Sequence, residues 1–268
     1  MARSDHTSAE AGLLTQLRAE IRRRLFPHRH TTLLAALIVV FLLRPFTGDS
    51  GAGPPLITVA MLLLLMLALY NIDVDELVGD REILLAQRRR RNIIAWTLGV
   101  PAVVERLVAI LAPTHKVYLG GTFLWLLLFA YITWNELRAV LRQKEVTREV
   151  ISMSISTYLL LGFTCGLFYI LLHDLQPNAF SFGAGAPATE TETLPVLMYF
   201  SLTTLSTIGF GDITPVTLQA RYVAVAEGIT GQFYLAILVA RLVGMQMSQS
   251  ASPQTETKTK ESAIRSNE

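Results

Sequence analysis

The sequence predicts an all-α membrane protein with six transmembrane helices and one shorter helix that enters the membrane and turns back. Three observations lead to this prediction. Hydrophobic residues make up 51% of the 268 residues and charged residues only 16%, well below the roughly 25% of a soluble domain. The apolar residues form long uninterrupted runs, with basic clusters between them. One further apolar stretch, between the fifth and sixth long runs, is too short to cross a membrane and leads into a segment with two glycines.

Six apolar runs approach the length of about twenty residues that a helix needs to span a bilayer. They cover residues 31–46, 55–72, 94–112, 118–134, 155–173 and 218–247. We expect Gly99 and Pro101 to interrupt the third run. Basic residues cluster before the first run, between the second and third, and between the fourth and fifth. Because positive charge favours the cytoplasmic side, we expect a multi-pass plasma-membrane protein with both termini in the cytoplasm.

The short apolar stretch covers residues 193–206 and precedes the sequence TIGFGD. At about 1.5 Å per residue it would reach roughly 20 Å, against about 30 Å for the hydrocarbon core. We therefore expect a half-helix going in and an extended segment coming out. Irregular backbone at membrane depth is stable only where protein buries it or where it lines water. The carbonyls of residues 207–211 then need polar partners, and a desolvated cation would supply them.

Glycines alternate with larger residues in this segment. To aim successive carbonyls at one axis, alternate residues need backbone angles that side chains with a Cβ avoid, and Gly209 and Gly211 adopt such angles at little cost. We expect Ile208 and Phe210 to point away from the axis, into packing that holds the segment open. The Thr207 hydroxyl would add a ring of oxygens below the carbonyls.

Residues 207–212, Thr-Ile-Gly-Phe-Gly-Asp, resemble the selectivity-filter signature of potassium channels, in which carbonyls of a TVGYG loop bind the ion. Residues 212–231 are similar to the start of the inner helix in bacterial potassium channels, and the specific resemblance covers about residues 194–244. The six-span layout resembles the voltage-gated channel superfamily. Phe210 departs from the pattern, because tyrosine is commoner there and its hydroxyl usually bonds the pore helix.

The resemblance implies a potassium-selective channel that conducts passively and is not an enzyme. Potassium would bind the carbonyls of Thr207, Ile208, Gly209 and Phe210 and the Thr207 hydroxyl, within a filter that extends to Gly211. Asp212 would lie at the outer mouth and raise the local cation concentration.

One loop cannot enclose an ion, so we expect a homotetramer. A weakly selective cation channel on the same fold and a non-conducting tetrameric scaffold or sensor remain open alternatives. The formal net charge of +2 gives no sign of a nucleic-acid partner.

These expectations divide the chain into five parts. They are a cytoplasmic N-terminal segment (1–30), a four-span peripheral unit (31–135), a cytoplasmic linker helix (136–150), a pore domain (151–247) and a disordered tail (248–268). The fourth span contains no arginine or lysine. Since each gating charge contributes about 2.3 kcal/mol per 100 mV, we expect no strong voltage gating.

Glu227 lies about nine residues into the sixth span, where an ionised carboxylate is costly. We expect it to turn away from the axis, to carry a proton, and to brace the filter through pore-helix hydroxyls. The candidate hydroxyls are those of Ser201, Thr203, Thr204 and Ser206. The alternative is a charged Glu227 that faces a wet cavity and attracts cations.

Gly228 and Gly231 are candidate hinges of the sixth span, and Gly231 is favoured because it aligns with the hinge glycine of the channels it resembles. Small residues also permit close helix packing in membranes. Glu105 and Arg106 are adjacent on one helix and do not face each other, so we expect separate structural partners or a wet crevice. A residual gating charge is the alternative.

Two basic clusters carry weaker expectations. Arg88, Arg89, Arg90 and Arg91 are expected to anchor the cytoplasmic face, with binding of anionic lipid as the more specific hypothesis. The cluster at residues 28–30, His-Arg-His, is expected to be a basic anchor at the membrane interface.

Overall fold

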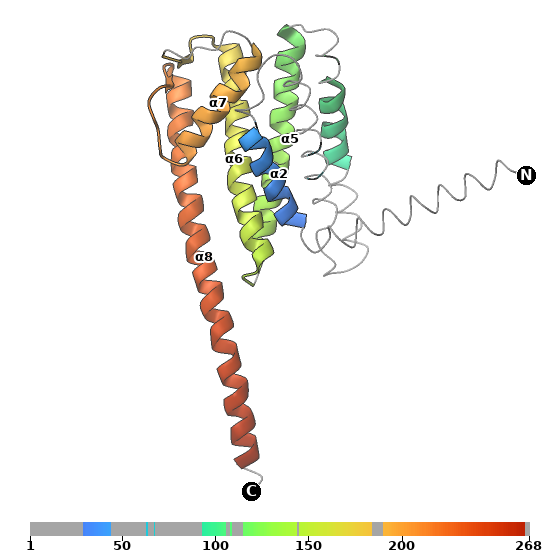
Figure 1. Ribbon diagram of the computed structural model, residues 1–268, viewed down its shortest axis with the longest axis vertical. Helices are drawn as coiled ribbons and strands as arrows, with labels where there is room; N and C mark the ends of the chain where they lie inside the picture. Colours follow the sequence, from blue (N-terminus) through green and yellow to red (C-terminus); the bar gives the residue numbers. More distant parts are fainter. Residues whose placement is uncertain are drawn as a thin grey trace, which may run out of the picture.

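A computed structural model describes residues 29–43, 93–105, 115–143, 145–183 and 190–265, together with the single residues 63, 67 and 108. The helices are α2 (Arg29–Leu43), α5 (His115–Arg142), α6 (Arg148–Leu175), α7 (Glu190–Leu205) and α8 (Leu218–Arg265), and a short ladder pairs β1 (Phe180–Ser181) with β2 (Thr214–Pro215). Another apolar helix covers Ile93–Glu105. Figure 1 shows α7 lying obliquely between the long helices α6 and α8. The predicted all-helical fold is confirmed for this part of the chain.

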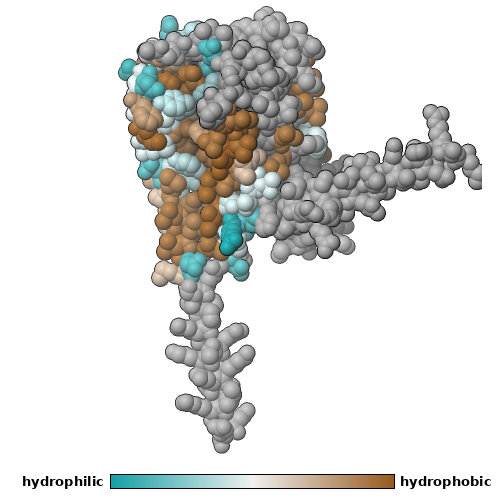
Figure 2. Space-filling view, viewed as in Figure 1, coloured by the Kyte–Doolittle hydropathy of each residue, from teal (hydrophilic) through white to brown (hydrophobic). Residues whose placement is uncertain are grey.

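Three helices are long and apolar enough to cross a membrane: Leu119–Arg142, Arg148–Leu175 and Leu218–Met247. They correspond to the fourth, fifth and sixth predicted spans, and Figure 2 shows the hydrophobic surface along this side of the molecule. The first and third predicted spans fall on shorter apolar helices, and the third is helical through Gly99 and Pro101. The second lies outside the described residues except for positions 63 and 67. Six spans therefore remain a prediction.

Helix α6 is the centre of the fold. Its Leu160 is completely buried in one hydrophobic core with Leu33 and Leu37 of α2 and Leu128 of α5. The same core continues to α7, where Leu197 is also completely buried. The peripheral helices and α7 thus share one core with α6, so the position of α7 is set by α6.

Two glycines of α6 allow α7 to approach closely. A Cβ at Gly166 would lie 2.5 Å from the Met198 sulfur, and a Cβ at Gly162 would lie 2.6 Å from Leu202 Cδ2. Glycines four positions apart share a helix face and bring backbones together in membrane helices. The four-residue spacing of Gly162 and Gly166 is visible in the sequence, but the helix that packs on it is not.

The predicted linker helix at residues 136–150 is not a separate element. Its first half is the end of α5 and its last residues are the first turn of α6, with a break at residues 143–147. The prediction was wrong because Thr147 caps a new helix: its side chain accepts a hydrogen bond from Val150 N at 3.3 Å, as N-cap residues do. Glu149 in the first turn complements the helix dipole.

The predicted disorder of residues 248–268 is also corrected, because α8 continues as a helix to Arg265. This stretch is too polar to form a hydrophobic core of its own, but a helix that has already formed can continue through polar residues. Its nucleation cost has already been met in the apolar part of α8, and each added residue then gains a backbone hydrogen bond.

One arginine attaches the middle of α8 to the end of α5. Arg241 donates through Nη1 to the carbonyl of Val140 (2.8 Å) and through Nη2 to those of Leu141 (2.5 Å) and Gln143 (2.6 Å). The last carbonyls of a helix lack partners inside it, and a cation there is favourable towards the helix dipole. The forked guanidinium reaches several acceptors at once, so Arg241 caps α5 and fixes α8 beside it.

Candidate functional site

The candidate site begins at the end of α7, a helix of 16 residues that is about 24 Å long. Figure 1 shows the chain leaving the lower end of α7 and returning to the upper end of the molecule, where α8 starts. The returning segment covers residues 206–217 and contains the candidate filter. The structure thus has the short helix and the irregular return that the sequence predicts.

Backbone hydrogen bonds fix the direction of the first carbonyls in this segment. Thr207 N donates to the Thr204 carbonyl at 3.0 Å, and both Ile208 N (2.9 Å) and Gly209 N (3.2 Å) donate to the Thr203 carbonyl. In a trans peptide the carbonyl points opposite to the N–H of the next residue, and no described peptide is cis. The carbonyls of Thr207 and Ile208 therefore point away from α7, towards the open side of the segment.

The backbone angles alternate along the segment. Thr207, Gly209 and Gly211 have positive φ values of 59°, 53° and 80°. The prediction for the two glycines is confirmed. Thr207 was not predicted, because a β-branched residue at positive φ is an outlier that nothing in the local sequence favours. Within the described part of the chain, the carbonyls of residues 207–211 accept no backbone hydrogen bond.

The large side chains of the segment are less buried than expected. Ile208 is 59% and Phe210 68% exposed within the single chain, so this chain alone does not supply the packing predicted for them. The Phe210 ring stacks on Tyr199 of α7, with ring centres 6.2 Å apart and planes at 4°. The Asp212 side chain accepts a hydrogen bond from Ile213 N at 3.0 Å. Through its stacking on Phe210, Tyr199 is a site residue that the sequence interpretation missed.

The outer end of the segment is tied to the loop after α6. β1 and β2 form an antiparallel ladder with Phe180 opposite Pro215, and Val216 N donates to the Ala179 carbonyl at 2.8 Å. Phe180 itself is buried and packs edge-on against Tyr169. Because Asp212 lies two residues before β2, this ladder fixes the chain next to it.

A tyrosine and a glycine fix the last carbonyl of α7. Tyr158 of α6 donates its hydroxyl to the Leu205 carbonyl at 3.0 Å. A Cβ at Gly231 would lie well inside contact distance of that same oxygen and 2.9 Å from Leu205 Cδ1, whereas a Cβ at Gly228 would be 3.7 Å from the Thr204 carbonyl. Gly231 therefore has a packing role, and α8 is continuous through it. The hinge stays a prediction.

Glu227 lies behind the candidate filter, between three helices. It is 3% exposed, with Oε1 2.5 Å from Ser201 Oγ and Oε2 2.5 Å from the Tyr169 hydroxyl. Ser201 was among the expected partners. Thr203 and Ser206 instead donate to carbonyls of their own helix, and Tyr169, 58 positions away in sequence, had no local signal.

Glu105 has a hydrogen-bond partner on α5. Trp125 Nε1 donates to Glu105 Oε2 at 3.3 Å, and the carboxyl group lies directly against Gly121, so a Cβ at Gly121 would require the Glu105 side chain to move. Arg106 and the run at residues 88–91 lie outside the described residues, so the lipid-binding hypothesis for that run stays a prediction.

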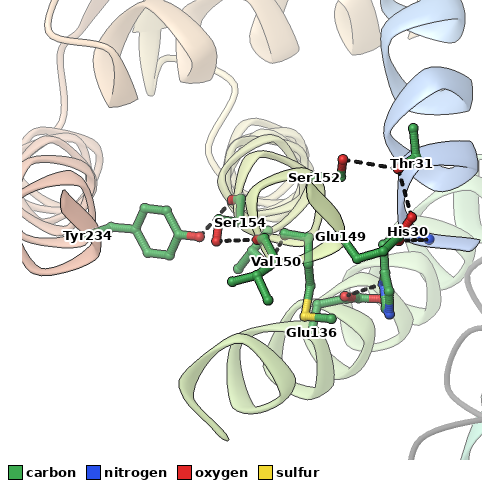
Figure 3. Close-up of polar contacts among 10 residues, drawn as sticks. His30, Thr31, Glu136, Glu149, Val150, Ser152, Ser154 and Tyr234 are labelled. Atoms are coloured by element: carbon green, nitrogen blue, oxygen red, sulfur yellow. Dashed lines mark hydrogen bonds and ion pairs between the residues drawn. The ribbon is translucent and has the colours of Figure 1, made fainter. Parts of the chain in front are cut away.

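The sequence predicts a basic anchor at the membrane interface around His30, and the structure buries this side chain between helices. It is 3% exposed and its Nδ1 is 3.5 Å from Glu136 Oε2 of α5. Glu149 of α6 accepts hydrogen bonds from His30 N (3.2 Å) and from the Thr31 hydroxyl (3.1 Å). Carboxyl groups of α5 and α6 therefore hold the first turn of α2 against these two helices (Figure 3). Position 28 lies outside the described residues.

Comparison with known proteins adds to this geometry. Residues 154–247 match the family model described as an ion channel. This stretch includes most of α6, the whole of α7, the returning segment and the apolar part of α8. This part of the chain resembles an ion channel. The similarity is in keeping with the prediction that the protein is not an enzyme.

Two relatives match over similar lengths. The chain is 34% identical over 79 residues to two-pore potassium channel 4 of Arabidopsis thaliana, which covers 29% of this chain and 28% of that protein. It is 33% identical over 86 residues to protein LctB of Geobacillus stearothermophilus, which covers 32% of this chain and 62% of that protein. The chain therefore spans less than two thirds of each relative.

Proposed function

We propose that this protein is a potassium-selective channel of the plasma membrane, in which potassium passes through the segment at residues 207–211. The observation that carries the proposal is the alternation of positive φ at Thr207, Gly209 and Gly211. It occurs where amide N–H groups turn back to α7 and leave carbonyls on the open side. Rings of backbone carbonyls replace the hydration shell of an ion in such filters. The partial similarity to a protein named as a potassium channel supports the choice of ion.

The proposal includes a homotetramer, because one returning segment forms only one side of an ion path. On α8, Tyr222, Val225, Ile229 and Phe233 are each more than half exposed. Their spacing of three and four places them on one helix face. Ile208 and Phe210 of the returning segment are exposed as well. A second copy of the chain would cover these side chains and supply the packing that the filter lacks in one chain.

The proposal also places both termini in the cytoplasm and Asp212 at the outer mouth. Asp212 and the filter lie at one end of the described helices, whereas Arg138, Arg142 and Arg148 lie at the other, around the break between α5 and α6. Basic residues favour the cytoplasmic side. A carboxylate at the opposite end would raise the cation concentration near the filter.

The test uses the full chain in liposomes and compares potassium with sodium flux. Gly211→Ala puts a Cβ on a residue with φ of 80°, which side chains rarely accept. We expect it to abolish potassium flux while the oligomer remains intact. Gly244→Ala is the matched control, because a Cβ there meets nothing within 4 Å.

Three outcomes would contradict the proposal. Selective flux retained in Gly211→Ala would remove the filter assignment. Equal potassium and sodium flux in the wild type would favour a weakly selective cation channel. A stable tetramer without flux would favour a non-conducting scaffold.

A further inference from the structure

Glu227 is a buried carboxyl group without a cation. It is 3% exposed, and no arginine or lysine in the described part of the chain forms an ion pair with it. Its neighbours are the hydroxyls of Tyr169 and Ser201 and the thiol of Cys165. A buried charge is costly unless it is paired. Since its own chain already buries Glu227, assembly with other copies would not return it to water.

The oxygen–oxygen distances around Glu227 require a count of protons. Tyr169 Oη lies 2.5 Å from Glu227 Oε2, Ser201 Oγ lies 2.5 Å from Glu227 Oε1, and Ser201 Oγ also lies 2.7 Å from the Gly162 carbonyl. Each of these contacts is at O–H···O distance, so each needs a proton between its oxygens. A hydroxyl carries one proton and a carbonyl carries none. Tyr169 and Ser201 together supply two protons for three contacts.

The missing proton has one source among these groups. If Glu227 were ionised, Ser201 would have to donate to either the carboxylate or the Gly162 carbonyl, and the other close pair would be two oxygens without a proton. A protonated Glu227 donates from Oε1 to Ser201, which leaves the Ser201 proton for the Gly162 carbonyl. Tyr169 donates to Oε2. All three contacts are then hydrogen bonds.

We propose that Glu227 is held as a neutral carboxylic acid, which donates a hydrogen bond to Ser201 and so positions α7 between α6 and α8. The chain of bonds runs from Tyr169 of α6, through Glu227 of α8 and Ser201 of α7, to the Gly162 carbonyl of α6. Ser201 lies six positions before Thr207 on the helix that orients the first filter carbonyls. Glu227 is therefore a positioning residue for the proposed conduction site, and its role in conduction rests on that proposed function.

The protonation state has a direct spectroscopic test on the full chain in lipid. We compare infrared spectra of the wild type and Glu227→Gln, in water and in deuterium oxide. The expected difference is loss of the C=O stretch of a protonated carboxylic acid, which shifts in deuterium oxide. Glu145→Gln is the matched control, because Glu145 is exposed between α5 and α6 and gives the spectrum of a carboxyl group in water. Loss of carboxylate bands in Glu227→Gln would overturn the proposal.

Tyr169→Phe provides a second measurement if Glu227→Gln does not fold. This variant removes the donor to Oε2, so the acid C=O band should remain present but move to higher frequency. A spectrum without an acid band, or an acid band that stays at its wild-type frequency in Tyr169→Phe, would overturn the proposal.

Potassium flux separates this inference from the proposed function. The amide introduced by Glu227→Gln can donate to Ser201 and accept from Tyr169, so this variant should conduct, whereas Glu227→Leu should lose the tetramer or its selective flux. An acid band in a wild type that conducts no potassium would refute the channel and leave the neutral acid intact. Normal stability and flux in Glu227→Leu would refute the positioning role.

Discussion

Replacing Gly231 with alanine separates close packing from hinge flexibility in α8. A Cβ at this position falls inside contact distance of the Leu205 carbonyl oxygen. That oxygen belongs to the backbone and is held by the Tyr158 hydroxyl at 3.0 Å. A side-chain rotation cannot relieve the overlap, so the end of α7 has to move by about 1 Å. This end is two residues before Thr207, so the shift reaches the filter.

Gly228→Ala is the control that isolates the packing effect. Alanine is more favourable than glycine inside a helix by about 0.5–1 kcal/mol, and this gain applies at both positions. At Gly228 the new Cβ meets the Thr204 carbonyl at 3.7 Å, an ordinary contact. Overpacking at Gly231 costs about 1–3 kcal/mol. Because the helix gain is common to both variants, Gly231→Ala should be less stable than Gly228→Ala by about 1–3 kcal/mol per chain.

The assay is unfolding of each purified variant, followed by tryptophan fluorescence, together with potassium and sodium flux in liposomes. We expect Gly228→Ala to be as stable as the wild type or slightly more stable. Gly231→Ala should unfold earlier and lose selectivity. Equal stability of the two variants would refute the packing argument. A stable, selective Gly231→Ala channel that opens rarely would support the hinge instead.

Three further predictions concern other contacts. Tyr158→Phe removes the hydroxyl that donates to the Leu205 carbonyl, so the free energy of unfolding should fall by about 1–3 kcal/mol and potassium selectivity should fall. Tyr234→Phe is the control: it removes a hydroxyl bonded to Ser154 O and should leave selectivity unchanged. Arg241→Ala removes the donor to three carbonyls at and just after the end of α5, so it should lower the thermal unfolding midpoint. Arg241→Lys should recover only part of that loss in midpoint, because lysine lacks the forked guanidinium group. Without an arginine array in α5, single-channel recordings should show little change in open probability between about −100 and +100 mV; a steep sigmoid would contradict this.

The sequence alone determined the features that depend on length and local sterics. Long apolar runs can be stable only as buried or membrane helices, so α5, α6 and the apolar part of α8 were predictable. The short length of α7 followed from the number of apolar residues before the filter motif. Gly209 and Gly211 were expected at positive φ because only a residue without a Cβ adopts such angles at little cost. None of these inferences needs a partner from elsewhere in the chain.

Local sequence did not predict where two of the helices begin and end. The stretch from residue 136 to residue 150 has a continuous helical pattern, but the Thr147 cap divides it. The C-terminal tail is polar, yet α8 extends through it. In both regions the start and continuation of a helix depend on neighbouring turns that are already formed.

Only the tertiary structure decided which side chains hold the candidate site in place. Tyr158 reaches Leu205 across 47 positions, Tyr169 reaches Glu227 across 58, and Arg241 reaches α5 across about 100. Such contacts come from the packing of whole helices and leave no periodic or local signal. The positive φ of Thr207 has a different cause. It is unfavourable for a β-branched residue, and it is held by the hydrogen bonds that connect residues 207–209 to the last turn of α7, a geometry that residue preferences alone do not predict.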